Sequence, residues 1–435
     1  MNARIQINLP EDFNGGLLKQ YAAQCDYCCI LESNPQAEYT YPDAPDYDCL
    51  AAFQAAEVLE APAGEAFQKV QDFYDKHRDY LFGHWGYDLK NEVEQLTSSN
   101  SANEDFPDCA FFIPEFLFVQ KSGKWTALVR PGKEEELTRI VKELGRFTPP
   151  ASKPRSGKIT SRITKAQYIK RVLSLKHHIK IGDIYEANFC QDFFAEAQLP
   201  DPYELYCELM NNSPAPFAGF YRLNGRFLLC SSPERFLKKS GITLTSQPIK
   251  GTAPRSSDLE KDKALRKALY NDEKERAENV MIVDLVRNDL SRTAAPQSVY
   301  VKELYGIYTF PSVHQMISTV CSTLKPGTPF IQSIKSAFPP GSMTGAPKIK
   351  AMQLIEDYEA FRRGIYSGSL GYITPDGDFD FNVVIRSVVY DRPRQTLSFA
   401  VGGAITDLCD PEKEYEESLL KAQSMMNAVR RYTSR

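Results

Sequence analysis

The chain has 435 residues, of which 42% are hydrophobic and 25% are charged, as in ordinary globular proteins. These proportions exclude a disordered, collagen-like or coiled-coil protein, and the length allows a large buried core in one or two lobes. The net charge of −4 argues against a broad nucleic-acid surface. No apolar run approaches the ~20 residues of a membrane span, and the N-terminus lacks the apolar segment of a secretory signal. We therefore expect a cytoplasmic protein that binds neither nucleic acid nor membrane.

The ten cysteines are mostly scattered singly within apolar stretches, which is typical of reduced, buried thiols. Cys25, Cys28 and Cys29 contain one CxxC, but the chain has no second CxxC. A structural zinc site usually needs four ligands. We expect packed thiols here rather than a metal.

The first 147 residues have the pattern of a mixed α/β region. Apolar spacing predicts a helix over residues 67–80, and apolar runs predict strands over 110–119 and 125–129, joined by a Ser-Gly-Lys turn. The polar stretch 97–105 is expected to be a surface loop. Residues 148–158 are rich in proline, serine and glycine and are the predicted linker, so a second, larger domain would cover residues 159–435.

In the second part, short apolar segments alternate with amphipathic ones. Tight turns at Asn224-Gly225 and Asp376-Gly377 favour antiparallel pairing, so we expect an α+β protein with large antiparallel sheets and helices on their faces. The predicted helices cover residues 166–181 (ending at Gly182), 257–270, a region from 273 onward and 412–432, and the predicted strands cover 217–223, 226–230, 242–246, 369–373, 380–390 and 396–401.

Two pairs of glutamates are candidates for a metal site. Glu275 and Glu278 are three residues apart, as are Glu414 and Glu417, and this spacing puts both members of a pair on one face of a helix. Two such helices facing each other would offer four carboxylates to one cavity, and Mg²⁺ prefers oxygen ligands. The alternative is that each pair forms part of a solvated charged face.

Lys250 and Glu234 each follow an apolar segment and are candidate chemical groups. Lys250 lies just before a glycine, and a lysine beside a metal or an apolar wall can lose its proton and act as a nucleophile. Glu234 lies at a strand end and can face the same cavity. An ordinary surface lysine and an ordinary strand-end carboxylate are the alternatives.

Arg386 is a charge within a strongly apolar predicted strand. A buried guanidinium needs an anion, which is either a carboxylate of the protein or a carboxylate of a bound substrate. Glycine-rich stretches at residues 338–348 and 400–404 are either tight turns or places where backbone N–H groups approach an anion.

Taken together, these segments resemble the chorismate-utilising enzymes, and within that family the aminodeoxychorismate synthases most closely. The resemblance covers residues 160–430, and weaker matches precede it at Gly86-Tyr-Asp-Leu89 and Leu31-Glu-Ser33. The matching motifs, in chain order, are PIKGT (248–252), AENVMIVDLVRNDL (277–290), PPGSMTGAPK (339–348), RRGIYSGSLGY (362–372) and DPEKEYEESLLKA (410–422).

The resemblance implies a fold, a domain arrangement and a reaction. The fold would be a sandwich of antiparallel sheets with helices outside, in which residues 1–147 pack on a chorismate-binding catalytic domain at 159–435. Lys250 stands where anthranilate synthases carry alanine and aminodeoxychorismate synthases carry lysine. Glu186 stands where isochorismate synthases carry a water-activating lysine, which argues against water as the nucleophile.

The resemblance also implies a role for each matching residue. Glu278 and Glu417 would hold Mg²⁺, and Glu275 and Glu414 would contribute directly or through water. Lys250 would attack C2 of chorismate, Glu234 would protonate the departing C4 hydroxyl, and ammonia would then add at C4 and expel the lysine. The expected substrate-binding residues are Gly251, Thr252, Gln315, Ser342, Tyr366, Arg386, Gly402 and Ala404.

Two departures and one absence affect this interpretation. Gln315 stands where relatives carry a histidine, with His314 before it, and Leu31-Glu32-Ser33 resembles a tryptophan-binding motif of anthranilate synthases. The chain lacks the GxCxGxQ segment of a glutamine amidotransferase, so ammonia would come from a separate glutaminase subunit. The alternatives are an anthranilate synthase component I and a non-catalytic subunit that binds chorismate for regulation.

Overall fold

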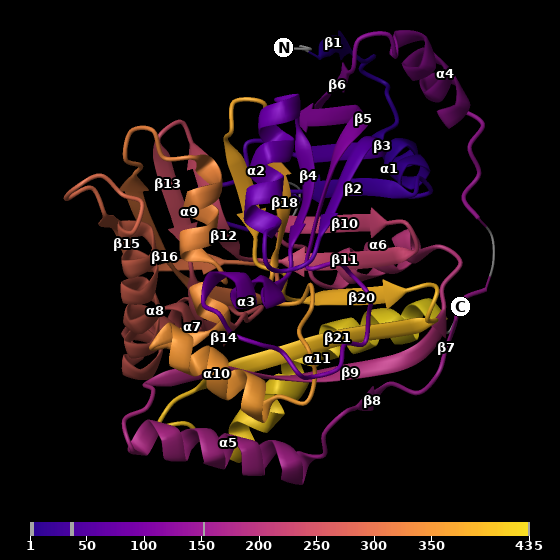
Figure 1. Cartoon of the computed structure of the whole chain (residues 1–435). Coiled ribbons are helices and arrows are strands. Elements are labelled where there is room, and N and C mark those ends of the chain that lie inside the picture. Colours follow the sequence, from indigo (N-terminus) through magenta and orange to yellow (C-terminus); the bar gives the residue numbers. More distant parts are fainter. Residues whose placement is uncertain (1–3, 35–38, 151–152, 434–435) are drawn as a thin grey trace.

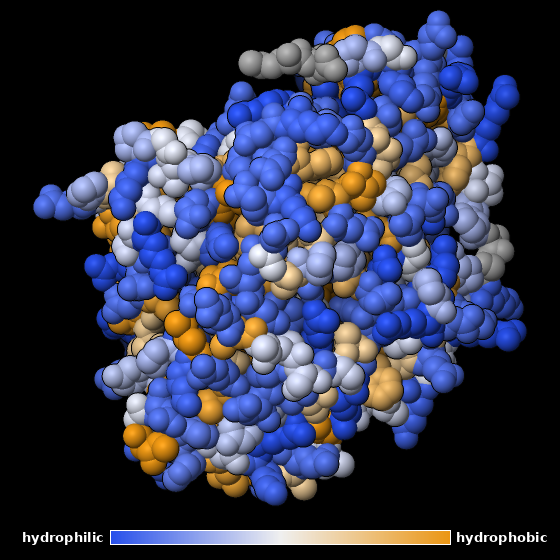
Figure 2. All heavy atoms as spheres, viewed as in Figure 1, coloured by the Kyte–Doolittle hydropathy of each residue, from blue (hydrophilic) through white to orange (hydrophobic). Residues whose placement is uncertain are grey.

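The computed structural model describes residues 4–34, 39–150 and 153–433. The expected α+β architecture is confirmed, with antiparallel sheets at the centre and helices around them (Figure 1). The face seen in Figure 2 is mostly hydrophilic, with apolar side chains showing in small groups between charged ones. Within the described ranges, no helix combines the length and the apolar character needed to span a bilayer.

Two long central strands, β3 (Cys49–Ala61) and β5 (Cys109–Lys121), pair with each other and are shared by two sheets. From β3 the first sheet continues through β2 (Tyr27–Glu32), β10 (Phe217–Leu223), β11 (Arg226–Ser232), β20 (Ser387–Asp391), β21 (Thr396–Ile405) and β9 (Glu186–Gln198). At its other end β5 pairs with β6 (Lys124–Val129), which pairs with β1 (Ile5–Asn8).

The second sheet begins where β4 (Leu81–Trp85) pairs with the first half of β5. It continues through β18 (Ser369–Ile373), β19 (Phe379–Asn382), β12 (Arg235–Ser240), β13 (Thr243–Gln247) and β16 (Val313–Thr323), and β16 also pairs with β14 (Ile249–Pro254) and β15 (Tyr300–Thr309). In Figure 1 the first sheet extends downward from the shared strands and the second extends to their left.

An apolar layer between the two sheets holds the sandwich together. Phe82 of β4, Phe112 of β5, Leu228 of β11 and Val389 of β20 belong to one buried cluster. Side chains alternate between the two faces of a strand, so each strand gives one face to this layer and the other to a helix. This arrangement explains why the central strands are apolar along almost their whole length.

Helices cover the outer faces. The first sheet packs against α1 (Gly15–Ala22), α4 (Glu134–Leu144), α6 (Pro202–Asn212) and α11 (Pro411–Thr433). The second packs against α2 (Ala66–His77), α8 (Glu273–Ser291) and α9 (Phe330–Ala337). Helices α5 (Lys165–Lys180) and α10 (Lys348–Tyr358) cover the start of β9, and α7 (Leu259–Asn271) lies against β14.

Capping residues set the start of the helices that matter most for the site. The Asp272 side chain accepts a hydrogen bond from the backbone N–H of Glu275 and so begins α8. Thr164 and Gln167 form a capping box at the start of α5, and Gly182, at φ +85°, follows its end as predicted. The start of α8 therefore places Glu275 in the first turn and Glu278 one turn later.

The predicted strand 380–390 is wrong in one respect, because it is two strands. β19 ends at Asn382 in the second sheet and β20 begins at Ser387 in the first, so the chain crosses between the sheets over residues 383–386. Ile385 and Arg386 lie in this crossing, and Arg386 has a left-handed φ of +53°. Arg386 is therefore in a bend and not in a strand.

The predicted linker at residues 148–158 contains a short strand. Residues 151–152 lie outside the described residues, but Arg155–Ser156 form the short strand β7, which pairs with the end of β9. Strands β2 and β4 of the first 147 residues pair with β10 and β18 of the remainder. The division into an N-terminal region and a catalytic domain stays a prediction.

All ten cysteines are free thiols, and eight of them are buried. Burial raises the pKa of the Cys28, Cys29 and Cys49 thiols well above its ordinary value. These thiols behave as small apolar side chains in the core.

Replacing Phe82 by alanine tests the layer between the sheets. The Phe82 ring is fully buried and lies 5.9 Å from the Tyr372 ring, centroid to centroid, so Phe82→Ala is expected to cost about 3–5 kcal/mol of unfolding free energy. Leu408→Ala is the control, because Leu408 is 83% exposed. Urea unfolding followed by circular dichroism measures both, and equal midpoints for the two variants would contradict this packing.

Candidate active site

Most of the site residues predicted from the sequence meet where β9, β14, β21, α8 and α11 come together. A Cβ built on Gly251 of β14 would lie 3.1 Å from Glu275 Oε2 of α8, so these two residues are in contact distance. A Cβ on Gly403 of β21 would lie 3.2 Å from Glu414 Oε2 of α11. Each helix thus presents one glutamate pair to a glycine-containing strand.

Lys250 forms the central polar contact of this region. Its Nζ donates a hydrogen bond to Glu186 Oε1 at 2.7 Å, and the Lys250 side chain is only 10% exposed. Burial alone lowers the pKa of Lys250, but the carboxylates of Glu186 and Glu278 outweigh burial and raise that pKa above its ordinary value. Without a bound substrate, Lys250 is therefore a cation.

The two glutamate pairs are joined by a lysine that the sequence patterns did not single out. Lys274 Nζ lies 3.7 Å from Glu278 Oε1 of the first pair and 3.7 Å from Glu414 Oε1 of the second. On α11, Glu417 forms an ion pair with Lys421 at 2.9 Å. The predicted facing of the two helices is therefore realised, with a cation between them.

Burial raises the pKa values of Glu275, Glu278 and Glu414. Desolvation and the nearby carboxylates of Glu186 and Glu275 raise the pKa of Glu278 to about 7, against the opposing effect of Lys250. The pKa values of Glu275 and Glu414 are also raised, first by burial. For Glu417, burial is outweighed by Lys421, and the pKa is lowered.

Glu234 and Ser342 line one narrow pocket together with Pro248. Glu234 lies between β11 and β12, as expected for a strand-end residue, and is 4% exposed. Burial raises the pKa of Glu234 to about 7, although Ser342 and Lys250 oppose the shift. A carboxyl group with such a pKa can hold a proton near neutrality and give it to a leaving group.

Arg386 has no anionic partner among the described residues. Its side chain takes part in no hydrogen bond or ion pair there. Burial lowers the pKa of the guanidinium, and the nearby Tyr366 and Glu417 oppose this shift. An internal salt bridge, the alternative left open by the sequence, is thus not formed. The guanidinium is available for an external anion.

The remaining predicted substrate-binding residues lie on neighbouring strands. Thr252 pairs with Gln315 in the β14–β16 ladder, and Ala404 pairs with Asn188 in the β21–β9 ladder. Thr252 is exposed, whereas Gln315 is buried and its Oε1 has no hydrogen-bond partner in the part of the chain that the structure describes. Gly402 accepts a hydrogen bond at its carbonyl from Lys421 Nζ at 3.1 Å.

The donor set fits Mg²⁺ by its chemistry. It consists of carboxylates, which are the preferred ligands of this ion, and Glu278 Oε1 is buried without a hydrogen-bond partner in the described ranges. Within the described part of the chain, however, no three acidic, histidine or cysteine side chains converge on one point in ligating geometry. Lys274 lies between the pairs and gives the buried carboxylates their positive counter-charge instead.

A buried arginine network supports the site from behind. Arg363 donates to Glu359 at 2.6 Å, to the Met343 carbonyl at 2.7 Å and to the Asn188 carbonyl at 2.8 Å. Asn188 in turn donates to the Ser342 carbonyl at 3.0 Å. The Arg363 guanidinium therefore fixes β9 against the turn that carries Ser342.

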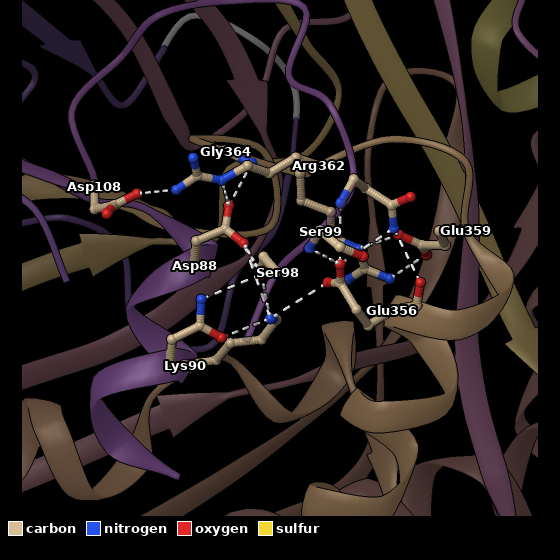
Figure 3. Close-up of polar contacts among 12 residues, drawn as sticks. Asp88, Lys90, Ser98, Ser99, Asp108, Glu356, Glu359, Arg362 and Gly364 are labelled. Atoms are coloured by element: carbon tan, nitrogen blue, oxygen red, sulfur yellow. Dashed lines mark hydrogen bonds and ion pairs between the residues drawn. The ribbon is translucent and has the colours of Figure 1, made fainter. Parts of the chain in front are cut away.

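The network extends outward to the N-terminal region, as Figure 3 shows. Glu356 lies 3.5 Å from Lys90 Nζ, and Arg362 lies 3.0 Å from Asp88 and also contacts Asp108. Lys90 and Asp88 are almost fully buried. These ion pairs connect the segment after α10, which leads to Tyr366, to residues 88–108.

The sequence patterns found the pairs of glutamates, Lys250, Glu234 and Arg386, but they missed the basic residues that support them. Lys274 is four residues before Glu278, an ion-pairing spacing on a helix that could have been recognised. The Arg363–Glu359 pair has the same four-residue spacing, but the two other partners of Arg363, the backbone carbonyls of Met343 and Asn188, are distant in the chain. The roles of the glutamate pairs, Lys250, Glu234 and Arg386 in substrate or metal binding stay predictions.

The architecture defines the class of protein. Residues 25–427 match the chorismate binding enzyme family, and the chain belongs to that family. Among solved structures, anthranilate synthase component I from Streptococcus pneumoniae superposes with a TM-score of 0.78 at 25% identity, covering 89% of this chain and 93% of that one. MenF, the menaquinone-specific isochorismate synthase from Escherichia coli, has the same fold, with a TM-score of 0.78 at 17% identity over 98% and 94% of the two chains.

The curated relatives include aminodeoxychorismate synthases and an anthranilate synthase component 1. Aminodeoxychorismate synthase component 1 of Escherichia coli is 33% identical over 80% of this chain and 76% of its own length. The chloroplastic aminodeoxychorismate synthase of Arabidopsis thaliana is 35% identical over 84% of this chain, but the match spans only 42% of that relative. Anthranilate synthase component 1 of Streptomyces coelicolor is 32% identical over 81% and 73% of the two chains.

Glu359→Gln tests the buried network. Removing one charge of the Arg363–Glu359 pair leaves a buried guanidinium without its counter-charge, which is expected to cost about 3–5 kcal/mol of unfolding free energy. Glu260→Gln is the matched control, because the Glu260–Lys263 pair is exposed and is expected to contribute about 0–1 kcal/mol. Chemical unfolding measures the unfolding free energy of both variants. A similar decrease in the two variants would contradict the larger contribution expected of the buried pair.

Proposed function

We propose that this protein aminates chorismate at C4 with ammonia to give 4-amino-4-deoxychorismate, on the way to 4-aminobenzoate and folate. The observation that carries the proposal is the amine of Lys250 beside Glu186 and Glu278, close enough to Glu234 to lower its pKa. The relatives named aminodeoxychorismate synthase support it. The chain spans less than half the length of several of these relatives, so the reaction is proposed for the part of the chain that they share.

The substrate would bind through its carboxylates and its ring. Arg386, which has no anion of its own in the described residues, would take the enolpyruvyl carboxylate together with the hydroxyl of Tyr366. The backbone N–H groups of Gly402 and Ala404 would cradle the same side of the ligand. Gly251, Thr252, Gln315 and Ser342 would line the ring.

Mg²⁺ would be held by Glu278 and Glu417, with Glu275 and Glu414 contributing directly or through water. When bound there, the ion would act as a Lewis acid on the ring carboxylate and as a template for the substrate. The four carboxylates of this chain supply negative charge that Lys274 and Lys250 offset only partly. The site is therefore suited to a cation.

Glu234 would transfer the proton in this reaction, and Lys250 would form the covalent bond to the substrate. Glu234 would hold a proton near neutrality and deliver it to the C4 hydroxyl as that group leaves as water. The unprotonated Lys250 Nζ would attack C2, and ammonia would add at C4 while the bond to lysine breaks. The buried first half of β9 would help to exclude bulk water, which would otherwise compete as the nucleophile.

Ammonia would come from a separate glutamine amidotransferase subunit. The Escherichia coli relative is named component 1, which supports a partner subunit for this chain. Free ammonium would replace the partner in a purified system. A cytoplasmic location, and an N-terminal region at 1–147 that packs on a catalytic domain at 159–435, are parts of the same proposal.

The assay that tests the function uses the purified protein with chorismate, Mg²⁺ and ammonium, and separates the products by chromatography. We expect 4-amino-4-deoxychorismate. Glu234→Gln, which cannot donate the carboxylic proton, is expected to lower the rate by about 10²–10⁴-fold, and Lys250→Ala is expected to bring it to background while chorismate still binds. Direct formation of anthranilate would show the reaction of an anthranilate synthase instead.

Mg²⁺ binding is expected to depend on pH. The pKa of Glu278 is raised to about 7, so this carboxyl is protonated below that pH and cannot ligate, and it becomes an ionised ligand above it. The apparent Mg²⁺ affinity should therefore increase as the pH rises through 7 and then level off. Calorimetric titration with MgCl₂ measures this, and Glu278→Gln should remove the pH dependence together with most of the affinity.

A further inference from the structure

Glu186, the first residue of β9, has an unusual environment that the proposed mechanism does not use. Its side chain is fully buried, and Oε1 accepts the hydrogen bond from Lys250 Nζ at 2.7 Å. Its second oxygen, Oε2, is also buried and has no hydrogen-bond partner among the described residues. A buried carboxylate that satisfies only one oxygen is costly, which marks it as a group kept for a purpose other than stability.

Lys250 cannot attack a ring carbon while it is an ammonium ion, and its burial separates it from bulk water. The ionisable groups that affect it are Glu186, Glu278 and Glu234, together with Glu275 and Lys274 of α8 and Glu417 of α11. The residues that pair with Glu186 and Ala187 on neighbouring strands, Ala346 of β17 (Gly345–Ala346) and Ile405 of β21, carry no ionisable side chain. Of these groups only Glu186 is hydrogen-bonded to Lys250 Nζ.

We propose that Glu186 is a catalytic proton acceptor: it takes the proton of the Lys250 ammonium before the amine attacks, keeps it during turnover, and returns it when the lysine is released. This inference rests on the proposed function. The starting pair is an ammonium and a carboxylate, and the transfer gives an amine and a carboxylic acid. The 2.7 Å hydrogen bond gives the proton a direct path from Lys250 Nζ to Glu186 Oε1.

Protons and bonds balance over the cycle. The neutral amine forms the C2–N bond as the C4–O bond breaks, and Glu234 supplies the proton that makes the leaving hydroxyl water. Ammonia then forms the C4–N bond as the C2–N bond breaks, which releases Lys250 as the neutral amine. Glu234 recovers its proton from the new C4 ammonium group, and Glu186 returns its proton to Lys250. No oxidant or reductant is needed.

The test measures the formation of the covalent adduct, not the overall turnover. The full-length protein is mixed with Mg²⁺ and chorismate without ammonia, and intact-mass spectrometry follows a mass increase of chorismate minus one water over a range of pH. Mg²⁺ is kept saturating. In the unmodified protein the proton moves internally, so the rate should follow the pKa of about 7 of Glu234 and fall as the pH rises through that value. In Glu186→Gln the proton must leave to solvent first, so the rate should be lower by about 10²-fold at neutral pH, and its ratio to the unmodified rate should rise with pH.

The variants are chosen to separate a chemical role from a structural one. Glu186→Asp keeps a carboxylate and should restore the pH profile of the unmodified protein in part, whereas Glu196→Gln changes an exposed carboxylate on the same strand and should have no effect. A Glu186→Gln rate that is unchanged, that is lower by the same factor at every pH, or that exceeds the unmodified rate would overturn the inference. If the unmodified protein forms no adduct and no aminated product, it is the proposed function that fails.

Discussion

The ion pair between Lys250 and Glu186 joins the two sheets of the sandwich at the candidate site. Lys250 lies on β14 of the second sheet, and Glu186 begins β9 of the first. Because both groups are buried, neither can be charged without the other, so the position of each depends on the packing of both sheets. The glutamate pairs of α8 and α11 surround this contact, and the charge balance of the whole region depends on it.

That charge balance explains how so many acidic side chains can lie close together in one region. Lys274, Lys421 and Lys250 reduce the repulsion among the carboxylates, but burial keeps the pKa values of Glu278, Glu275 and Glu414 raised. Arg386 stands apart from this group, at the bend where the chain crosses from β19 to β20. The region thus offers acidic groups suited to a cation and a guanidinium suited to an anion, which is the charge distribution that a metal-bound carboxylate substrate requires.

Much of this arrangement could be predicted from local patterns, because those patterns have local causes. Helix spacing located α8 and α11 and put each glutamate pair on one face, and a terminating glycine located the end of α5. The break at Val383–Arg386 could not be predicted, because an apolar run looks the same whether it stays in one sheet or crosses to another. The pairing of Lys250 with Glu186 and of Arg363 with the Asn188 carbonyl could not be predicted either, since these partners lie 64 and 175 residues away along the chain.

The proposed site for chorismate and Mg²⁺ is tested most directly by a crystal structure of the Lys250→Ala variant with both bound, because this variant should not consume the substrate. The account predicts the cation between Glu278 and Glu417, the ring above position 250, and the enolpyruvyl carboxylate on Arg386. Density for the substrate at another surface, with Arg386 still free and the glutamate pairs joined only by Lys274, would contradict it.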